Sequence, residues 1–600
     1  MSQPKPLELT IRLVRHRRLL FVGTCLLWAL IHVLPVLYGV FVKALFDALS
    51  GAGAAGQSAW SYLALALAVD VARLGLLGGG IVAWCTYWIE TTLLLRRNLL
   101  DHLLNAPGSR RLPDSPGEAI SRFRDDVNDI AEYVESWVDF WGLAAFAAFA
   151  LVVMMAIDPL MTTLVCVPLL LTFFLTGLLR PRIRRVRKAM RESTGRVTDF
   201  IGEMTGGVQA LKVAGAEGSA LAHFDALNSR RRKAALEDTL ITEIFRSVTD
   251  NMVNIATGII LLLAAGALKE GSFSVGDFAL FVAYLPRLTG VMSFIGAMLV
   301  QHKRTGIAFE RLERLMQDAE SSVAVADLDL HLSGPLPAYV DVRPEPLPLR
   351  KLTVDRLSYR HPDGALGIDE VSFELERGAF TVVTGPVGSG KSTLIRALLG
   401  LLPATSGTVS WNGVKVEDPA TFFVPPRSAY TPQVPRLFSD SLRENLLLGS
   451  TSDPLAVEEA LNLAVLREDV ARLERGLDTP VGSRGVKLSG GQVQRSAAAR
   501  MFLRDADLLV FDDLSSALDV QTEALLWERL GQRGEVTCLV VSHRPAALAR
   551  ADRILLMDGG RLVEQGALAD LLAGSALFLS LLHRSDESRE VGETLSQTAV

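Results

Sequence analysis

The stretch that decides the fold is Gly385-Pro386-Val387-Gly388-Ser389-Gly390-Lys391-Ser392-Thr393, between an apolar run at 381–384 and a helical pattern at 394–399. Glycines in such a loop let backbone N–H groups point at a phosphate, and a helix that follows adds the positive end of its dipole. The complete G-x-x-x-x-G-K-S pattern between a strand and a helix is typical of a P-loop, in which Lys391 reaches the outer phosphates and the Ser392 hydroxyl ligates Mg²⁺. The sequence therefore predicts a nucleotide site here.

Composition indicates that apolar residues are concentrated in part of the chain. Of the 600 residues, 49% are hydrophobic, and the mean hydropathy is +0.30 although 21% are charged. This length predicts two or more domains. The net charge of -5 and the lack of a basic stretch with interleaved aromatics give no sign of nucleic-acid binding. The 4 cysteines lie far apart in apolar runs, which favours buried free thiols over a metal site or a disulfide framework.

Six apolar runs in the first half of the chain are long enough to cross about 30 Å of hydrocarbon. They cover residues 19–42, 60–89, 138–157, 160–179, 253–268 and 278–300. Basic residues crowd the N-terminus, the end of the sixth run and the two long loops, which join the second run to the third and the fourth run to the fifth. The short alternate loops contain one basic residue, Lys269. By the positive-inside rule, both termini and the long loops are cytoplasmic.

The two long cytoplasmic loops have helical patterns of their own. In the first, Ile120, Phe123 and Val127 fall on one helical face, and the second includes the segment 208–217. Membrane helices that extend into the cytoplasm and turn there would offer surfaces to a soluble domain. Ordinary solvated helices are the other interpretation that periodicity leaves open.

Charged residues inside the apolar runs need an explanation, because a charge at mid-membrane costs about 2.5–3.5 kcal/mol on insertion scales. Asp70 and Arg73 lie one helical turn apart in the second run. They either line a substrate path or form an i, i+3 pair that only permits insertion. His32, Glu90 and Asp139 are expected nearer a membrane interface.

The pattern changes after the sixth run. We expect a transmembrane domain over residues 1–320, a linker over 321–350, an α/β domain over 351–583 and a disordered tail over 584–600. The predicted fold is an α-helical membrane domain with six transmembrane helices and long cytoplasmic extensions, joined to an α/β P-loop NTPase domain.

Two further strands of this α/β domain end in polar residues. The apolar run 508–512 ends in Asp512, which is suited to hold Mg²⁺ opposite Ser392. Asp513 follows, where a carboxylate orients or deprotonates an attacking water. A second apolar run, 538–542, delivers His543, which we expect to hydrogen-bond the γ-phosphate.

A second phosphate-binding device lies in the same domain. Leu488-Ser489-Gly490-Gly491-Gln492 precedes a helix that is expected to begin near Val493. Together with Gln494-Arg495, this segment resembles the signature motif of ATP-binding cassette (ABC) proteins. Six spans followed by one cassette resemble a half-transporter of the exporter type, and the resemblance covers almost the whole chain.

The resemblance implies roles for individual residues. Gly385 to Thr393 match the Walker A motif, Asp512 the Walker B aspartate and His543 the switch histidine. Tyr359 matches the aromatic residue that stacks on adenine, and Gln433 the Q-loop glutamine that contacts Mg²⁺. Ser516-Ala517-Leu518-Asp519 match the D-loop, and the signature Ser489, Gly490, Gly491 and Gln492 would close over ATP held by a partner's P-loop. The segments from Gly117 and at 208–217 are similar to the family's coupling helices, which favours docking surfaces.

Two residues depart from the family pattern. Asp513 stands where Glu is usual, and one methylene less withdraws the carboxylate by about 1.5 Å. Ser483 stands where exporters commonly have Glu in the loop before the signature. With Asp513 in place of Glu, the chain resembles the subunit of heterodimeric exporters that hydrolyses ATP slowly, although Gln433 and His543 are intact.

The expected function is ATP-driven export or flipping of a hydrophobic or amphipathic substrate by a dimer of such chains in the plasma (inner) membrane. The small-molecule, lipid or peptide nature of the substrate stays open. One alternative is an ATP-holding regulatory subunit of a heterodimer with a slow site at Asp513; another is an importer with the same fold. Expected partners are a second half-transporter, membrane lipid and the substrate, with ATP and Mg²⁺ as cofactors.

Overall fold

The computed structural model describes residues 6–51, 58–105, 116–269, 272–317, 319–335, 344–361, 363–482 and 486–582. Ser483 and the expected tail at 584–600 therefore lie outside the described residues. Contacts within the chain divide it into two compact units, whose main boundary in the sequence falls between Leu332 and Ser333. We describe each unit by itself.

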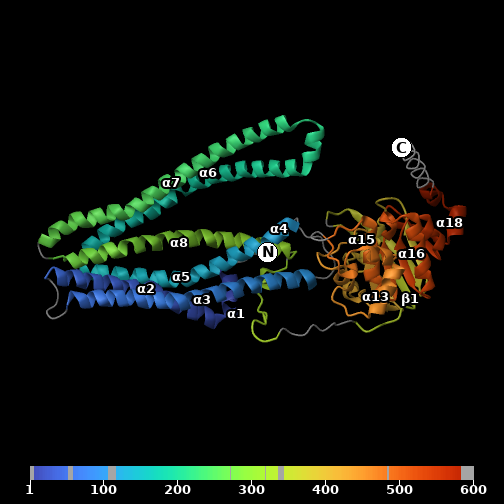
Figure 1. The fold of residues 1–600 in the computed structure, drawn as a ribbon, viewed down its shortest axis with the longest axis horizontal. Coiled ribbons are helices and arrows are strands. Elements are labelled where there is room, and N and C mark those ends of the chain that lie inside the picture. Colours follow the sequence, from blue (N-terminus) through green and yellow to red (C-terminus); the bar gives the residue numbers. More distant parts are fainter. Residues whose placement is uncertain are drawn as a thin grey trace. The chain divides into compact units, whose positions relative to one another are not determined.

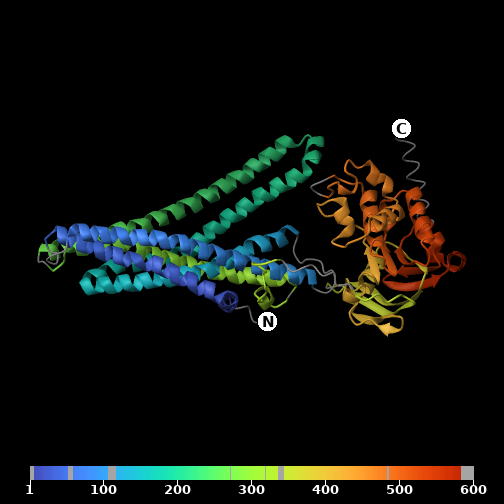
Figure 2. The ribbon, with the colours of Figure 1, turned by 60° about the horizontal axis from the view of Figure 1, so that its bottom comes forward.

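The first unit is helical. Its elements are α1 (Pro6–His16), α2 (Arg18–Leu49), α3 (Ala59–Asn105), α4 (Pro116–Ser121), the π-helix η1 (Arg122–Asp126), α5 (Val127–Ile157), α6 (Pro159–Val213), α7 (Glu217–Lys269), α8 (Val275–Leu315) and α9 (Ser321–Ala324). Helices α2, α3, α5 and α8 run side by side, and α6 and α7 form a long hairpin that diverges from them (Figures 1 and 2). This is the predicted helical membrane domain with long extensions.

Four of the six predicted spans lie in helices that are long and apolar enough to cross a membrane. These stretches are Arg18–Leu49, Ala59–Asn105, Gly117–Ile157 and Val275–Leu315, among the residues that the structure describes. The fourth and fifth predicted spans fall within α6 and α7, where many side chains lie outside the description. A shorter apolar stretch, Thr257–Lys269, coincides with most of the fifth. Those two spans stay predictions.

The spans pack closely at a few points. Tyr284 of α8 is 1% exposed, and its hydroxyl donates to the Val36 carbonyl of α2 at 2.5 Å. A Cβ added to Gly39 would lie 2.1 Å from the Tyr284 ring, so only glycine lets α2 and α8 approach this closely. Phe146 of α5 is also 1% exposed and packs against Tyr284 with the ring centroids 6.0 Å apart.

The first cytoplasmic segment is helical as predicted, but its three apolar residues do not share one face. The π-helix Arg122–Asp126 separates α4 from α5, and the Val127 N–H donates to the Arg122 carbonyl five residues back. This wider turn shifts the spacing on which the prediction rested. As a result Ile120 is 64% exposed, whereas Val127 is fully buried.

The beginning of the expected linker has structure. Asn98 of α3 donates its Nδ2 hydrogens to the carbonyls of Ala324 (3.0 Å) and Ala326 (2.8 Å). Ala324 is fully buried and Leu330 is 7% exposed, within a cluster that also contains Leu94 of α3. These contacts hold the chain against the first unit up to about the domain boundary.

The second unit contains two sheets. The four-stranded antiparallel sheet has the order β2-β1-β4-β5, with β1 (Lys351–Arg360), β2 (Leu366–Glu376), β4 (Ser406–Trp411) and β5 (Val414–Lys415). The six-stranded sheet has the order β10-β9-β3-β8-β7-β6, with β3 (Phe380–Thr384), β6 (Ser428–Thr431), β7 (Leu508–Asp512), β8 (Thr537–Val541), β9 (Arg553–Asp558) and β10 (Arg561–Gly566). All neighbours in the larger sheet are parallel except β9 and β10.

Short helices surround the larger sheet. They are α10 (Lys391–Leu398), α11 (Pro419–Phe422), α12 (Leu442–Leu447), α13 (Pro454–Leu463), α14 (Arg467–Arg472), the 3₁₀ turns η2 (Gly476–Asp478) and η3 (Leu514–Ala517), α15 (Gly490–Phe502), α16 (Val520–Gln532), α17 (Pro545–Arg550) and α18 (Leu568–Gly574). Strands β3, β7 and β8 are buried at every position, which is why their sequences are continuous apolar runs. Successive residues alternate between two cores: Val382 packs with the helices, and Val383 packs with α10 and the smaller sheet.

The cysteines agree only partly with expectation. All four are free, but only Cys538 of β8 is buried, while Cys25, Cys85 and Cys166 are half-buried in the single chain.

Candidate nucleotide site

The carboxyl ends of four neighbouring parallel strands place the predicted P-loop, Walker B, switch and Q-loop residues at one edge of the larger sheet. Strand β3 leads into the P-loop, β7 ends at Asp512, β8 leads to His543 and β6 leads to Gln433. Ligands in open α/β sheets bind at this edge, because loops from adjacent strands converge there.

The P-loop needs its glycines for two reasons. Gly385, Gly388 and Gly390 have φ of 143°, 84° and 95°, which side chains rarely adopt. A Cβ on Gly385 would lie 2.0 Å from the Met557 carbonyl oxygen, and one on Gly390 would lie 2.6 Å from that of Gly367. A Cβ on Gly388 would meet nothing within 4 Å, so this part of the loop faces open space of the kind a phosphate needs.

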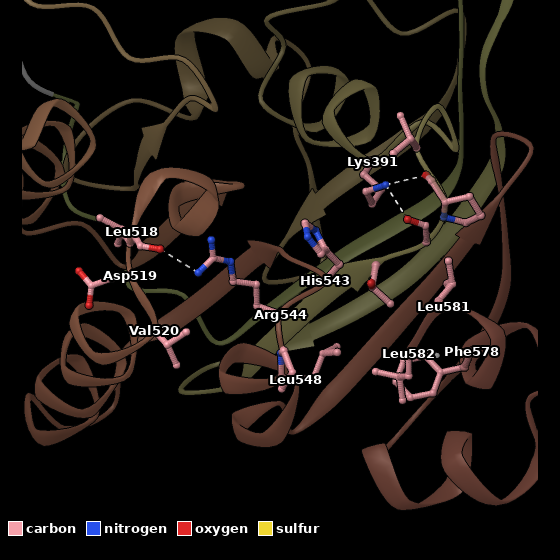
Figure 3. Close-up of a pocket in the computed structure, with 15 residues that line it drawn as sticks. Lys391, Leu518, Asp519, Val520, His543, Arg544, Leu548, Phe578, Leu581 and Leu582 are labelled. Atoms are coloured by element: carbon pink, nitrogen blue, oxygen red, sulfur yellow. Dashed lines mark hydrogen bonds between the residues drawn. The ribbon is translucent and has the colours of Figure 1, made fainter. Parts of the chain in front are cut away.

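Lys391 lies at the start of α10 and folds back over the loop. Its Nζ donates to the carbonyls of Gly385 (2.8 Å) and Pro386 (2.7 Å), as Figure 3 shows. Burial lowers the pKa of Lys391, and the negative charges of Asp513 and Asp512 oppose this shift. The ammonium therefore lies over the P-loop, and its contact with the outer phosphates of a nucleotide stays a prediction.

Asp512 is fully buried, and its carboxylate contacts three side chains. Its Oδ1 accepts from the Ser392 hydroxyl at 2.7 Å, and its Oδ2 accepts from the Tyr430 hydroxyl at 3.2 Å. Arg396 of α10 lies 3.7 Å from the same Oδ2. The hydroxyl and carboxylate oxygens of Ser392 and Asp512 are hard donors that suit Mg²⁺, which usually takes one or two protein ligands and completes its shell with phosphate and water.

Sequence reasoning missed Tyr430 and Arg396. Tyr430 lies in β6, three residues before Gln433, and Arg396 lies one turn into α10. Tyr430 is the next-to-last residue of β6, which pairs with the strand that ends in Asp512.

Asp513 has an unusual backbone and an incompletely bonded carboxylate. Its φ is 54°, in the left-handed region, and its N–H donates to the Val541 carbonyl at 3.1 Å. Its Oδ2 accepts from Gln433 Nε2 at 3.2 Å, whereas its Oδ1 is buried without a hydrogen-bond partner. Burial raises the pKa of Asp513, while the Gln433 hydrogen bond and the nearby His543 act in the opposite direction. A buried acceptor left free in this way fits a carboxylate that receives a hydrogen bond from water.

His543 lies beside a pocket of about 760 Å³, shown in Figure 3. The pocket is lined by P-loop residues, by Leu518 and Asp519 of the expected D-loop, by His543 and Arg544, and by Phe578, Leu581 and Leu582 near the end of the described chain. Arg544 Nη1 donates to the Leu518 carbonyl at 2.9 Å and to Glu523 Oε2 at 3.1 Å. The sequence patterns gave no sign of this C-terminal wall.

The signature segment corrects one prediction. Helix α15 begins at Gly490, not near Val493, because Ser489 and Gln492 form a capping box. The Ser489 hydroxyl accepts from the Gln492 N–H at 3.3 Å, and the Ser489 N–H donates to Gln492 Oε1 at 2.9 Å. Both glycines are therefore in the first helical turn.

Within this chain, the signature is joined to the Q-loop rather than to the P-loop pocket. Gln494 donates from Nε2 to the Gln433 carbonyl at 3.4 Å, and its Oε1 accepts from the Ala517 N–H at 3.2 Å. None of the described residues that line the pocket comes from 489–492. The signature therefore does not line this pocket, although a Cβ on Gly491 would lie 3.6 Å from Leu518 of the pocket wall.

Tyr359 does not offer a free ring face. Its side chain is 6% exposed, in the core beneath the smaller sheet. The next aromatic ring along the chain, His361, is half-buried and lies edge-on to Tyr359 with the ring centroids 5.1 Å apart.

The parallel sheet, the P-loop and the Ser392–Asp512 pair define a P-loop nucleoside triphosphatase domain, here in one chain with a helical membrane unit. Residues 20–292 match the ABC transporter transmembrane region, and residues 368–516 match the ABC transporter nucleotide domain. A lipid A-core flippase of Burkholderia thailandensis is 30% identical over 437 residues, which cover 72% of this chain and 70% of that protein. The chain belongs to the ABC transporter family as a half-transporter, and it is an integral membrane protein with an ATPase coupled to transport.

Other relatives and a solved structure agree with this assignment. An ATP-dependent lipid A-core flippase of Bordetella avium is 27% identical over 503 residues, 82% of each chain. A Staphylococcus aureus protein named for multidrug export is 28% identical over 501 residues, 82% of this chain and 84% of that one. The structure of a bacterial Atm1-family ABC exporter with ATP bound has the same fold, with a TM-score of 0.75 and 22% identity, over 95% of this chain and 98% of that chain.

Proposed function

We propose that this chain exports or flips a hydrophobic or amphipathic substrate by alternating access, as one half of a dimer. ATP bound between the P-loop of one chain and Ser489 to Gln492 of the other draws the two nucleotide domains together, and hydrolysis separates them. The observation that carries the proposal is the separation of the signature from the pocket beside the P-loop. The start of α15 can bind a phosphate but does not line the P-loop pocket of its own chain. A second copy of the domain, whose ATP it contacts, explains its presence.

The proposed chemistry assigns a task to each residue at the sheet edge. The P-loop N–H groups and Lys391 bind the phosphates, and Ser392 and Asp512 would hold Mg²⁺. The metal, when bound, neutralises charge on the β- and γ-phosphates. Asp513 accepts a hydrogen bond from the attacking water, and Gln433 keeps its carboxylate oriented. His543 donates to the γ-phosphate.

The adenine contact is reassigned in this proposal. Tyr359 was expected to stack on the base, but its ring is buried. We propose that His361 supplies the ring face instead, because it follows Tyr359 at the end of the same strand and is half-buried.

The exposed surface of the α6–α7 hairpin is an argument for a dimer. It diverges from the other helices (Figure 2). Both of its helices carry exposed apolar side chains outside the predicted spans. These include Val208, Val213, Leu236, Leu240 and Ile244. The segment 208–217 comprises the end of α6, a turn at 214–216 and the start of α7, and Val213 there is 85% exposed. Such surface is unfavourable in water and is explained by docking against a partner subunit or a nucleotide domain.

The relatives named as a lipid A-core flippase and as a multidrug export protein favour a lipid-like or drug-like substrate. The charge distribution of the loops favours a plasma (inner) membrane orientation with both termini and the cassette in the cytoplasm. One specific observation favours the regulatory alternative, namely Asp513 in place of Glu. No specific observation favours an importer.

Complementation between two dead variants tests the composite site. Lys391→Ala disables the P-loop, and Ser489→Arg blocks the signature. If ATP binds between two chains, each homodimer is inactive, but co-purified mixed dimers keep one complete site. A random mixture should then regain about one quarter of the wild-type sites, because half of the dimers are mixed. A mixture as inactive as its components would contradict the proposal.

A further inference from the structure

Strand β6 and the loop after it contact two consecutive carboxylates of the nucleotide site. Tyr430 of the strand donates its hydroxyl hydrogen to Asp512 Oδ2 at 3.2 Å. Gln433 of the loop, three residues further on, donates from Nε2 to Asp513 Oδ2 at 3.2 Å. The proposed chemistry uses the contact of Gln433 and gives no task to that of Tyr430.

The pairing of β6 with β7 brings the tyrosine to the carboxylate. Tyr430 lies opposite Val510 in this parallel pair, and Asp512 lies two residues beyond Val510. Because side chains alternate between the two faces of a strand, Val510 and Asp512 point to the same face, toward the core that contains α10. The ring of Tyr430 packs against the same core, so its hydroxyl reaches the carboxylate along one face of the sheet.

The two oxygens of the Asp512 carboxylate have different partners. Oδ1 accepts from the Ser392 hydroxyl at 2.7 Å, and these two oxygen atoms are hard donors that would hold Mg²⁺. Oδ2 accepts from Tyr430 and lies 3.7 Å from Nη2 of Arg396. The carboxylate therefore cannot turn Oδ2 toward a metal beside Ser392 without losing the hydrogen bond from Tyr430.

Magnesium is sensitive to the orientation of its ligands. It demands nearly ideal octahedral geometry, whereas Ca²⁺ accepts irregular geometry and carboxylates that bind through both oxygens. A group that hydrogen-bonds to a ligating carboxylate orients it, and loss of such a group typically weakens metal binding by about 10–100-fold. Asp512 is fully buried, so its orientation is set by the side chains around it rather than by bulk water.

We propose that Tyr430 is a positioning residue for magnesium. Its hydroxyl holds Oδ2 of Asp512, which leaves Oδ1 beside the Ser392 hydroxyl to face the metal. The assignment rests on the proposed function, because it takes Asp512 as a ligand of the Mg²⁺ that accompanies ATP. Since Gln433 holds Asp513, β6 and its loop then orient both the carboxylate for the metal and the carboxylate for the water.

The test is the affinity of the full-length protein in nanodiscs for the fluorescent, non-hydrolysable nucleotide mant-AMP-PNP, measured with Mg²⁺ and again in EDTA. Tyr430→Phe keeps the ring and removes the hydroxyl. It should lower the gain in affinity that Mg²⁺ provides by about tenfold. The affinity in EDTA should be unchanged, because the P-loop and Lys391 bind the phosphates. With Ca²⁺ in place of Mg²⁺ the loss should be smaller, because Ca²⁺ tolerates a carboxylate that has turned.

A hydroxyl on the other face of the same strand provides the matched control. Thr431 is fully buried, and its hydroxyl contacts the Met501 sulfur at 3.3 Å. Thr431→Val removes this hydroxyl from the opposite core and should keep the Mg²⁺ dependence of the wild type.

A double variant shows whether Tyr430 acts through Asp512. In an Asp512→Asn chain, Tyr430→Phe should cause no further loss of the Mg²⁺ gain or of the affinity in EDTA. A further loss there would mean that Tyr430 supports the fold of the site in general, and it would overturn the positioning role.

An unchanged Mg²⁺ gain in Tyr430→Phe, or an equal loss of affinity with Mg²⁺ and in EDTA, would also overturn this role. ATP turnover in the same nanodiscs keeps such a failure distinct from that of the proposed function. A Mg²⁺ gain that depends on Tyr430 in a chain that never hydrolyses ATP would support the assignment and refute the transport cycle. Normal turnover with a Mg²⁺ gain that does not depend on Tyr430 would do the reverse.

Discussion

Asp513 provides the sharpest test of how this chain uses ATP. Its Oδ1 is buried and unbonded, and its Oδ2 is held by Gln433 at 3.2 Å. If this carboxylate orients and deprotonates the attacking water, its replacement by an amide should lower kcat by about 100-fold or more, the usual contribution of a general base. The KM for ATP should change little, because Lys391 and the P-loop bind the phosphates. The assay is ATP turnover by the purified chain in nanodiscs.

The backbone at this position makes Asp513→Asn a clean substitution. Its φ of 54° is tolerated by Asn as well as by Asp, so the amide changes the charge without adding strain. Asp505 is the matched control, because it also has positive φ (46°) and its side chain is 89% exposed. Asp505→Asn should hydrolyse ATP like wild type.

Asp513→Glu distinguishes the exporter from the regulatory alternative. Glu restores the length that the family usually has, about 1.5 Å further toward the water, but it places a longer side chain in the left-handed region. If Asp513 already positions the attacking water, the ATP turnover of Asp513→Glu should not exceed that of the wild type by more than a few-fold. A silent wild type that Glu activates by about 100-fold, the cost of a 1 Å misplacement, would show that the chain is built to hold ATP. Wild-type turnover in Asp513→Asn would refute the catalytic role outright.

Three further outcomes follow from buried groups. Lys43→Met leaves the Asp277 carboxylate, whose side chain is 10% exposed, without its cation, and should destabilise the protein by about 3–5 kcal/mol; Asp277→Asn in the same chain should recover part of the lost Tm. Arg544→Ala leaves the carboxylate of Glu523, whose side chain is 2% exposed, without its cation. It should destabilise the nucleotide domain by a similar free energy, measured as a lower Tm, and Arg544→Lys should lower the Tm less. Burial raises the pKa of Cys538 to about 12, so roughly one thiol in ten thousand is ionised at pH 8. Mass spectrometry should find Cys538 unmodified by iodoacetamide in the native protein and alkylated after denaturation; alkylation of the native chain would contradict its burial.

Local patterns predicted the elements of the site well. The apolar runs before the P-loop, at 508–512 and at 538–542 are strands β3, β7 and β8, because a strand buried on both faces needs apolar residues at every position. Since parallel strands direct their carboxyl ends to one edge of a sheet, the order of residues along the chain was enough to place Lys391, Asp512 and His543 together.

Errors arose where a local rule competed with another. The helix after the signature begins at Gly490 because the Ser489–Gln492 capping box outweighs the low helix propensity of two glycines. Ile120 and Val127 face different surroundings because a π-turn lies between them. Tyr359 was matched by its position near the strand end, but its side chain points into the core.

The sequence by itself determined the class of this protein, since composition, hydrophobic period and the P-loop are properties of consecutive residues. Only the tertiary structure decided which polar groups meet: Ser392 and Asp512 are 120 residues apart in the chain, and Tyr430 completes their contact from a third element. Hydrophobic patterning specifies which face of an element is buried, but the partner across that face is chosen by the packing of the whole fold.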